Sequence, residues 1–221
     1  MTDHSLREKL TRTLRLQLVT DAARCGPRGM TSVVEAAVSG GVSCVQLREK
    51  SLDTRRFIER ARALKALLAP LGVPLIINDR LDVAWACGAD GIHVGQDDMP
   101  VEQIRQLLPH ALIGLSIESV AQLSAAEHLP VDYYSASPIF VTDTKRDAAA
   151  AIGLSGLRAM RAATSRPLVA IGGIDFDNAA EVLSAGADGL AVVSLLCGAS
   201  DPAAAAMRLG AMIRSAFDKG Q

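Results

Sequence analysis

The sequence predicts a single (β/α)8 TIM barrel, an α/β fold in which eight parallel strands close into a ring covered by helices. Short apolar segments alternate with helical segments eight times along the chain, and glycines separate several of these units. Hydrophobic residues make up 49% of the 221 residues, whereas aromatic residues make up only 3%. A core built from Val, Ile, Leu and Ala is typical of parallel strands buried beneath helices.

The expected elements follow from the pattern of apolar residues. Short apolar runs are interpreted as strands, and they cover residues 14–20, 43–48, 74–78, 91–94, 112–116, 132–135, 168–171 and 189–193. Segments of helical periodicity lie between and after them, at 32–39, 54–69, 82–86, 101–108, 120–127, 154–163, 176–185 and 202–216. Gly40, Gly88 and Gly186 each follow a predicted helix and precede the next strand. A Gly-Ala-Asp-Gly sequence occurs twice, at 88–91 and 186–189, and hints at a repeat within the barrel.

Length and composition predict one domain over residues 1–221, with residues 1–12 as a charged N-terminal extension. Barrels of this class commonly run to about 200–250 residues as one unit. The first residues lack the apolar core of a signal peptide. No apolar run approaches the roughly 20 residues of a membrane span. We therefore expect a soluble, cytoplasmic protein with no membrane partner, while its oligomeric state, a homo-oligomer included, is left open.

Charge and cysteine content exclude two further classes of function. Lys and Arg number 23 against 24 Asp and Glu, and no basic run is interleaved with aromatic residues, so nucleic acid is not expected as a partner. The four cysteines are far apart and have no zinc-binding spacing. Cys44 lies in an apolar strand pattern and Cys87 at the end of a helix pattern, so we expect buried free thiols.

Three polar residues alternate along the second predicted strand and its end: Gln46, Arg48 and Lys50. Side chains of a strand change face at every residue, so these three are expected on the inner face of the barrel. Buried cations are costly unless an anion pairs with them. The pattern predicts a phosphate-binding site where strands end, which is where barrels of this fold carry their active sites.

Two aspartates follow the next two strands, and they predict a metal site. Asp79 and Asp98 are expected to converge at the same end of the barrel, where two carboxylates and a substrate phosphate suit Mg²⁺. The alternative is that each aspartate caps the helix that follows it. His93 lies within an apolar strand and is interpreted as a hydrogen-bonded core histidine rather than a proton shuttle.

Other polar segments predict a second anion site and a lid. Gly172 and Gly173 follow the seventh strand, and Val193 and Ser194 follow the eighth, where barrels often bind phosphate through backbone N–H groups. A glycine turn that merely packs against a loop is the alternative. The long connection 140–154 predicts a binding loop, in which Thr142, Thr144 and Lys145 form a cluster of hydrogen-bond donors. A solvated, charged turn is the competing explanation for 145–147.

These motifs match those of a known family, in order and over nearly the whole barrel. The matching segments are 18–21, 45–50 (Val-Gln-Leu-Arg-Glu-Lys), 77–80 (Ile-Asn-Asp-Arg), 89–98 (ending Gly-Gln-Asp-Asp), 113–116, 137–145 and 170–174. On these residues the chain resembles the thiamine phosphate synthases, which are (β/α)8 barrels that join the pyrimidine and thiazole halves of thiamine.

The resemblance implies a role for each matching residue. Asp79 and Asp98 would hold Mg²⁺, Gln46 would meet the ring of an aminopyrimidine substrate, and its diphosphate would be surrounded by Arg48, Lys50, Asn78, Ser116 and Lys145. The thiazole phosphate would be held by Thr142, Thr144, Gly173, Val193 and Ser194. Lys145, Arg48 and Ser116 would carry catalysis, in which diphosphate departs to leave a pyrimidine-methyl cation. Such a step needs stabilisation of negative charge and no strong base.

Two departures from the family pattern and three alternatives stay open at this point. Glu118 replaces a common histidine, and Ser135 and Ser137 replace common glycines. A thiazole tautomerase on the same barrel would not need the diphosphate and metal residues. A sugar-phosphate epimerase or isomerase would need an acid–base pair, which the sequence does not offer. A noncatalytic binding protein would not require Asp79, Asp98 and Lys145 together.

Overall fold

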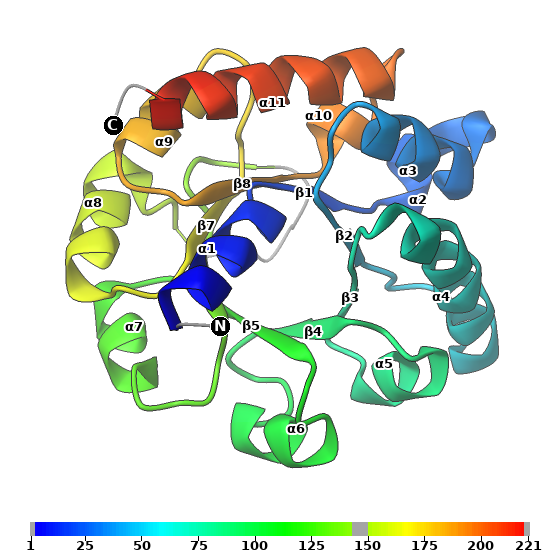
Figure 1. The fold of residues 1–221 in the computed structure, drawn as a ribbon, viewed down its shortest axis with the longest axis horizontal. Helices are drawn as coiled ribbons and strands as arrows, with labels where there is room; N and C mark the ends of the chain where they lie inside the picture. Colours follow the sequence, from blue (N-terminus) through cyan, green and yellow to red (C-terminus); the bar gives the residue numbers. More distant parts are fainter. Residues whose placement is uncertain (1–2, 143–149, 219–221) are drawn as a thin grey trace.

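Eight parallel strands form a closed barrel in which each strand pairs with the next and β8 pairs with β1 (Figure 1). The structure, a computed structural model, describes residues 3–142 and 150–218. The strands are β1 (Leu16–Val19), β2 (Cys44–Leu47), β3 (Leu75–Asn78), β4 (Gly91–Val94), β5 (Leu112–Ile117), β6 (Tyr133–Ala136), β7 (Leu168–Ile171) and β8 (Gly189–Val192). The predicted (β/α)8 barrel is confirmed, and all eight strands lie where the apolar runs place them.

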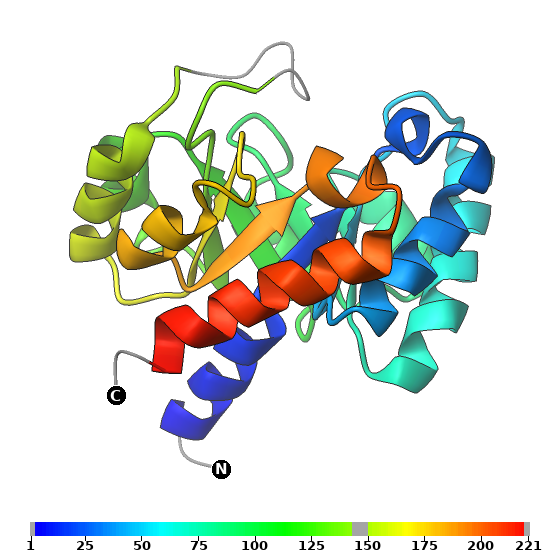
Figure 2. The same cartoon turned by 90° about the horizontal axis from the view of Figure 1, so that it is seen from above.

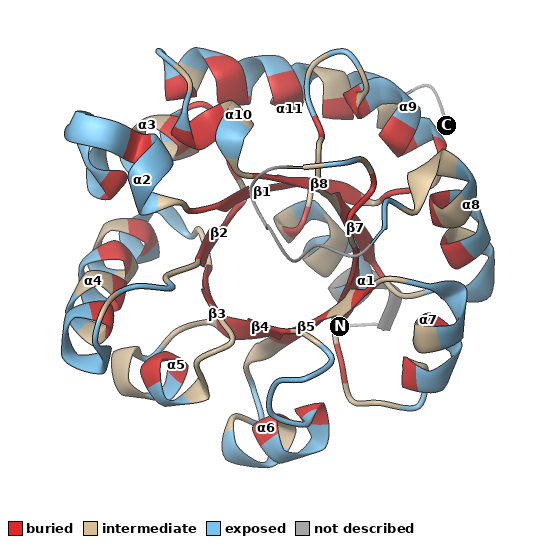
Figure 3. Cartoon of the chain, turned by 180° about the vertical axis from the view of Figure 1, so that it is seen from behind, coloured by how far each residue is buried: buried red, intermediate tan, exposed pale blue. Residues whose placement is uncertain are grey.

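Helices surround the barrel and bury one face each against it (Figures 1 and 3). The outer helices are α3 (Met30–Ser39), α4 (Thr54–Leu68), α5 (Leu81–Cys87), α6 (Val101–Leu107), α7 (Val120–Ala126), α8 (Gly153–Ala163), α9 (Ala179–Ser184) and α11 (Pro202–Asp218). Helix α9 begins three residues later than predicted, because the Asp175 carboxylate accepts hydrogen bonds from the N–H groups of Asp177 and Asn178 and holds them in a turn.

Several short elements were not anticipated. Helix α1 (Asp3–Thr13) lies within the stretch that was expected to be an extension, and it runs below the barrel at its N-terminal end (Figure 2). Short helices α2 (Ala22–Cys25) and α10 (Ser194–Cys197), and the 3-10 turns η1 (Gly26–Arg28) and η2 (Ala69–Leu71), lie in the connections. They are too short to leave a periodic signal in the sequence. The assignment of the whole chain to one domain stays a prediction.

The core has two parts, one on each side of the strands. The larger part lies between strands and helices and contains the outward-facing strand residues, such as Leu18, Val45 and Ile77. The smaller part fills the lower barrel interior with Leu14, Val19, Cys44, Ile76, Tyr133, Val169 and Ala191, and Leu10 of α1 packs against it. The lower half of the barrel is therefore filled, and open space remains at the other end.

A repeated aspartate explains the Gly-Ala-Asp-Gly sequences. Asp90 and Asp188 each precede a strand and accept a hydrogen bond from a backbone N–H at the start of the previous strand. Each also pairs with a cation of an outer helix, Lys65 and Arg161 respectively. These carboxylates bind strand to strand and strand to helix at the N-terminal end of the barrel, which is a structural role.

None of the helices among residues 3–142 and 150–218 combines the length and apolar character that a bilayer span requires. All four cysteines are free thiols, as predicted, and Cys25, Cys44 and Cys197 are buried. Cys87 was expected to be buried but is half-buried, because it lies at the end of the short helix α5.

Candidate active site at the C-terminal end of the barrel

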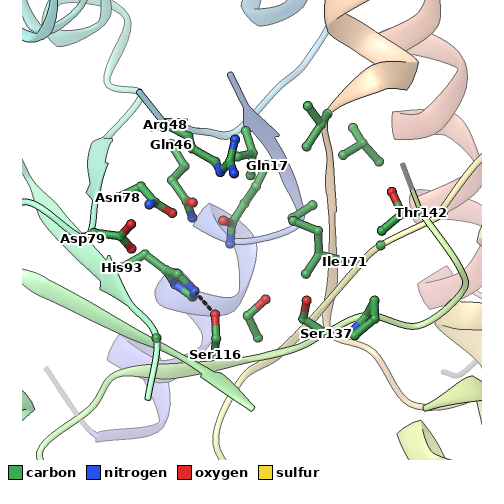
Figure 4. Close-up of a pocket in the computed structure, with 18 of the residues that line it drawn as sticks. Gln17, Gln46, Arg48, Asn78, Asp79, His93, Ser116, Ser137, Thr142 and Ile171 are labelled. Carbon is green, nitrogen blue, oxygen red and sulfur yellow. Dashed lines mark hydrogen bonds between the residues drawn. The ribbon is translucent and has the colours of Figure 1, made fainter. Parts of the chain in front are cut away.

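A cavity of about 370 Å³ opens at the C-terminal ends of the strands (Figure 4). Every strand contributes to its lining, either directly or through the loop that follows it. Of the residues predicted to form the site, those in its lining are Gln46, Arg48, Lys50, Asn78, Asp79, Asp98, Ser116, Thr142, Gly173, Val193 and Ser194. Thr144 and Lys145 lie outside the described residues.

The end of β2 places its three polar residues at different depths. The strand stops at Leu47, so Gln46 is buried, Arg48 is half-buried and Lys50 is exposed. The expectation of a buried lysine on the inner face was wrong, because the chain leaves the barrel before Lys50. The Lys50 side chain is 58% exposed, and its Nζ lies 2.7 Å from Oδ2 of Asp79. The cationic residues thus form the rim of the cavity rather than its floor.

Asp79 and Asp98 come together at this rim, as predicted. Partial desolvation raises the pKa of Asp98, and the nearby negative charge of Asp79 raises it further. Oδ2 of Asp98 accepts a hydrogen bond from the N–H of Gly95 at 2.7 Å, which fixes the loop after β4. Neither aspartate caps a helix, since the N-caps of α5 and α6 are Arg80 and Pro100.

The backbone at Asp79 is unusual and holds its carboxylate in place. Its φ is +63°, in the left-handed region that residues other than glycine seldom adopt. The N–H of Asp79 donates to the carbonyl oxygen of His93 at 2.8 Å, which ties the end of β3 to β4. Such conformations concentrate at functional sites, where neighbouring structure maintains them.

The floor of the cavity is made of buried, uncharged polar groups. The side chain of His93, 5% exposed, has Nε2 at 2.9 Å from Ser116 Oγ and Nδ1 at 3.0 Å from the Tyr133 hydroxyl. Burial lowers the pKa of His93 to about 4, so the imidazole is neutral at physiological pH. His93 is the hydrogen-bonded core histidine that was predicted, and it also positions Ser116 in the cavity.

The loops after β7 and β8 line the opposite side. Gly172 and Gly173 have φ of +103° and +64°, and a Cβ on either would lie 2.7–2.8 Å from Pro138, Phe140 or Val141. These glycines let the loop after β7 pack closely against the one after β6. Close packing against a loop was the alternative explanation for the two glycines, and the structure shows it. Gly173, Val193 and Ser194 nevertheless also line the cavity.

Several lining residues were not singled out as site residues. They include Gln17, Gly95, Gln96, Pro138 and Ile171. Gln17 had a readable signal, because a single polar residue interrupts the apolar strand β1 on the face that points inward. Glu118, Ser135 and Ser137, noted as departures from the family pattern, also line the cavity.

Comparison with known proteins identifies the family. A family model described as thiamine monophosphate synthase matches residues 16–196. The chain belongs to the thiamine monophosphate synthase family. It is 60% identical to the thiamine-phosphate synthase of Albidiferax ferrireducens over 201 residues, which is 90% of this chain and 92% of that protein. It is 51% identical to that of Chloroflexus aurantiacus over 205 residues, or 93% and 95% of the two chains.

A solved structure shares the same fold. Thiamine phosphate pyrophosphorylase from Pyrococcus furiosus superimposes with a TM-score of 0.87 at 37% identity, covering 94% of this chain and 99% of that one. Family membership makes the chain a transferase of thiamine biosynthesis that acts on small molecules, and it does not favour the tautomerase or the sugar-phosphate isomerase.

Proposed function

We propose that this chain condenses an aminopyrimidine methyl diphosphate with a thiazole ethyl phosphate, its carboxylated form included, giving thiamine phosphate and diphosphate. The observation that carries the proposal is the convergence of Asp79 and Asp98 beside Arg48 and Lys50 at one rim of the cavity. A site of this kind suits a departing polyanion, and membership of the thiamine monophosphate synthase family supplies the identity of the substrates.

The gradient of charge in the cavity supports one orientation of the pyrimidine substrate. Charged side chains lie at the rim, whereas the buried floor contains the neutral groups of Gln46, His93 and Ser135. Charged phosphates are costly to desolvate and an uncharged ring is not. The ring therefore belongs on the floor, near Gln46, and the diphosphate at the rim, near Arg48, Lys50 and Asn78.

Mg²⁺ fits the residues present at the rim. Among the described residues no group of three or more His, Cys, Asp or Glu side chains is arranged to hold a metal. Desolvation and the neighbouring charge of Asp79 raise the pKa of Asp98, so a divalent cation would stabilise the two ionised carboxylates more than the exposed Lys50 does, and phosphate oxygens complete the hard-oxygen set that Mg²⁺ prefers. Asp79 and Asp98 would hold the ion, which would supply charge neutralisation to the leaving diphosphate.

The remaining residues bind and orient. Arg48 and Lys145 neutralise charge as it develops on the leaving oxygens, and Ser116, held by His93, donates its hydroxyl to the substrate. Thr142, Thr144, Gly173, Val193 and Ser194 hold the thiazole phosphate so that the thiazole nitrogen faces the pyrimidine methylene. That nitrogen has a free lone pair, so the step needs no strong general base. We also propose the cytoplasm as the location.

One assay tests this function. The purified protein is mixed with both phosphorylated substrates and Mg²⁺, and thiamine phosphate and diphosphate are measured. Equal amounts of the two products, with formation abolished by EDTA, are expected. Isomerised thiazole phosphate without condensation would instead identify a tautomerase, and the absence of both reactions would point to a binding protein.

A further inference from the structure

Gln17 presents a buried amide to the cavity with one end unsatisfied. The residue lies on β1, is 1% exposed, and lines the cavity together with Gln46 of the adjacent strand (Figure 4). Among the residues that the structure describes, Nε2 of Gln17 has no hydrogen-bond partner. A buried N–H group without an acceptor destabilises a protein, so such groups need an explanation.

The strand neighbours of Gln17 give no structural reason for an amide. Its partners in the strand register are Cys44 of β2 and Ala191 of β8, and both belong to the apolar interior of the barrel. An unbranched apolar side chain such as methionine has nearly the same volume and would pack there without an orphaned donor. The amide therefore serves something that is absent from the folded chain alone.

The depth of Gln17 determines which part of a ligand it meets. Phosphates stay at the rim with Arg48, Lys50 and the two aspartates, so the group that reaches the floor is an uncharged ring. We propose that Gln17 is a substrate-binding residue whose Nε2 donates a hydrogen bond to a ring nitrogen of the aminopyrimidine. This inference rests on the proposed function and adds a recognition contact to it.

The contact makes a prediction about selectivity. A site with a buried donor rejects analogues that lack the matching acceptor, because the donor then stays unpaired. Gln17 should therefore discriminate the pyrimidine from a pyridine analogue in which one ring nitrogen is replaced by C–H. Only one of the two ring nitrogens should matter to Gln17.

The test compares Gln17→Met with Leu18→Met, which places methionine at the next residue of β1 on the face toward the helices. The probe is the aminopyrimidine methyl monophosphate, which lacks the diphosphate leaving group and is not consumed; its Kd is measured by calorimetry and the Tm by scanning calorimetry. We expect Gln17→Met to weaken binding at least tenfold and to raise the Tm, because the orphaned donor is removed. Leu18→Met should leave the Kd within twofold of the wild-type value.

The pyridine analogues decide between a direct contact and an indirect one. To the wild-type protein, one of the two analogues should bind at least tenfold more weakly than the pyrimidine. To Gln17→Met, the same analogue and the pyrimidine should bind equally well. The proposal would be overturned if the aminopyrimidine methyl monophosphate bound Gln17→Met and wild type with equal Kd values. It would also be overturned if both pyridine analogues lost the same affinity, relative to the pyrimidine, in both proteins. Gln17→Leu replaces Gln17→Met if the latter does not fold. Because the readout is binding, failure of this contact is distinct from failure of the wild-type protein to form thiamine phosphate.

Discussion

Lys50 and Asp79 form an ion pair across the ends of β2 and β3, with Nζ and Oδ2 2.7 Å apart. The pair joins a predicted diphosphate-binding residue to a predicted metal ligand. Its lysine is 58% exposed, so solvent weakens the attraction, and exposed pairs of this kind contribute about 0.2–1 kcal/mol. Lys50 can therefore be displaced from Asp79 by a divalent cation at little cost.

Replacing Lys50 should strengthen metal binding in the absence of substrate. Lys50→Met removes the competing cation, and we expect the affinity for Mn²⁺, measured by EPR titration, to rise about two- to fivefold, in proportion to the worth of an exposed pair. The Lys65–Asp90 pair lies at the other end of the barrel, so Lys65→Met should leave this affinity unchanged. A fall in Mn²⁺ affinity for Lys50→Met would show that Lys50 supports the metal site.

Replacing Asp98 should raise the stability of the metal-free protein and lower its activity. Asp98→Asn removes a negative charge from beside Asp79, whose repulsion contributes to the raised pKa of Asp98. We expect the Tm in EDTA to rise and turnover with Mg²⁺ to fall at least a hundredfold, since metal charge stabilisation is worth several kcal/mol.

Asp177→Asn is the control for these two measurements, because it makes the same substitution at an exposed aspartate that does not line the cavity. Its Tm and turnover should stay close to the wild-type values. A lower Tm for Asp98→Asn in EDTA would mean that the hydrogen bond from Gly95 outweighs the repulsion.

The neutral, buried His93 should make the protein sensitive to acid. Its pKa is about 4 in the folded protein and 6.5 in its ordinary state. The unfolded chain therefore takes up this proton first as the pH falls, and folding stability is lost between pH 6.5 and pH 4. The loss attributable to His93 is about 3 kcal/mol.

The contribution of His93 is isolated by comparing urea unfolding of wild type and His93→Gln at pH 7 and pH 4.5. The wild type should lose more unfolding free energy than the variant over this interval. Parallel losses in the two proteins would show that other groups cause the acid sensitivity.

Gly114 leaves room for the contact between His93 and Tyr133. A Cβ on this residue would overlap both side chains, so Gly114→Ala should cost about 1–3 kcal/mol of unfolding free energy through overpacking. Gly210 lies inside α11, where the nearest obstacle to a Cβ is the flexible end of Arg214 at 3.3 Å. Gly210→Ala should therefore stabilise the protein by about 0.5–1 kcal/mol. Chemical denaturation should show a lower unfolding free energy than the wild type for Gly114→Ala and a higher one for Gly210→Ala.

Lys145 is expected to act on the leaving diphosphate. Losing one well-placed donor in a comparable site costs about 2.7–4 kcal/mol, so Lys145→Ala should lower kcat about a hundredfold or more. Arg146→Ala tests the competing explanation of a charged surface turn and should have little effect. Near-normal kcat for Lys145→Ala would remove this residue from the proposed site.

The fold was predictable because barrel strands are buried on both faces and leave continuous apolar runs. Strands β4 and β7 begin and end at the predicted residues, 91–94 and 168–171. Helices α1, α2 and α10 were missed because two are a single turn long and α1 lies in a strongly polar stretch. Tertiary packing of residues such as Leu10 stabilises α1, and the local sequence does not report it.

The lining of the cavity was predictable where polar residues end a strand, as with Asn78, Asp79 and Ser116. The exposure of Lys50 was mispredicted because alternation was extended past Leu47, where the strand stops. The partners of His93 could not be predicted, since they come from β5 and β6 and depend on the stagger of strands in the closed barrel. The roles of the individual site residues stay predictions.

Helix α1 and the side chains packed inside the lower barrel close the N-terminal end of the barrel. Substrates and products therefore have to pass through the same opening, at the C-terminal ends of the strands, and a ligand that binds at the floor of the cavity has to enter before one that binds above it. If the aminopyrimidine ring binds at the floor of the cavity, as proposed, it has to enter before the thiazole phosphate, and thiamine phosphate has to leave through the same opening. The closed N-terminal end of the barrel would thus impose an ordered binding of the two substrates.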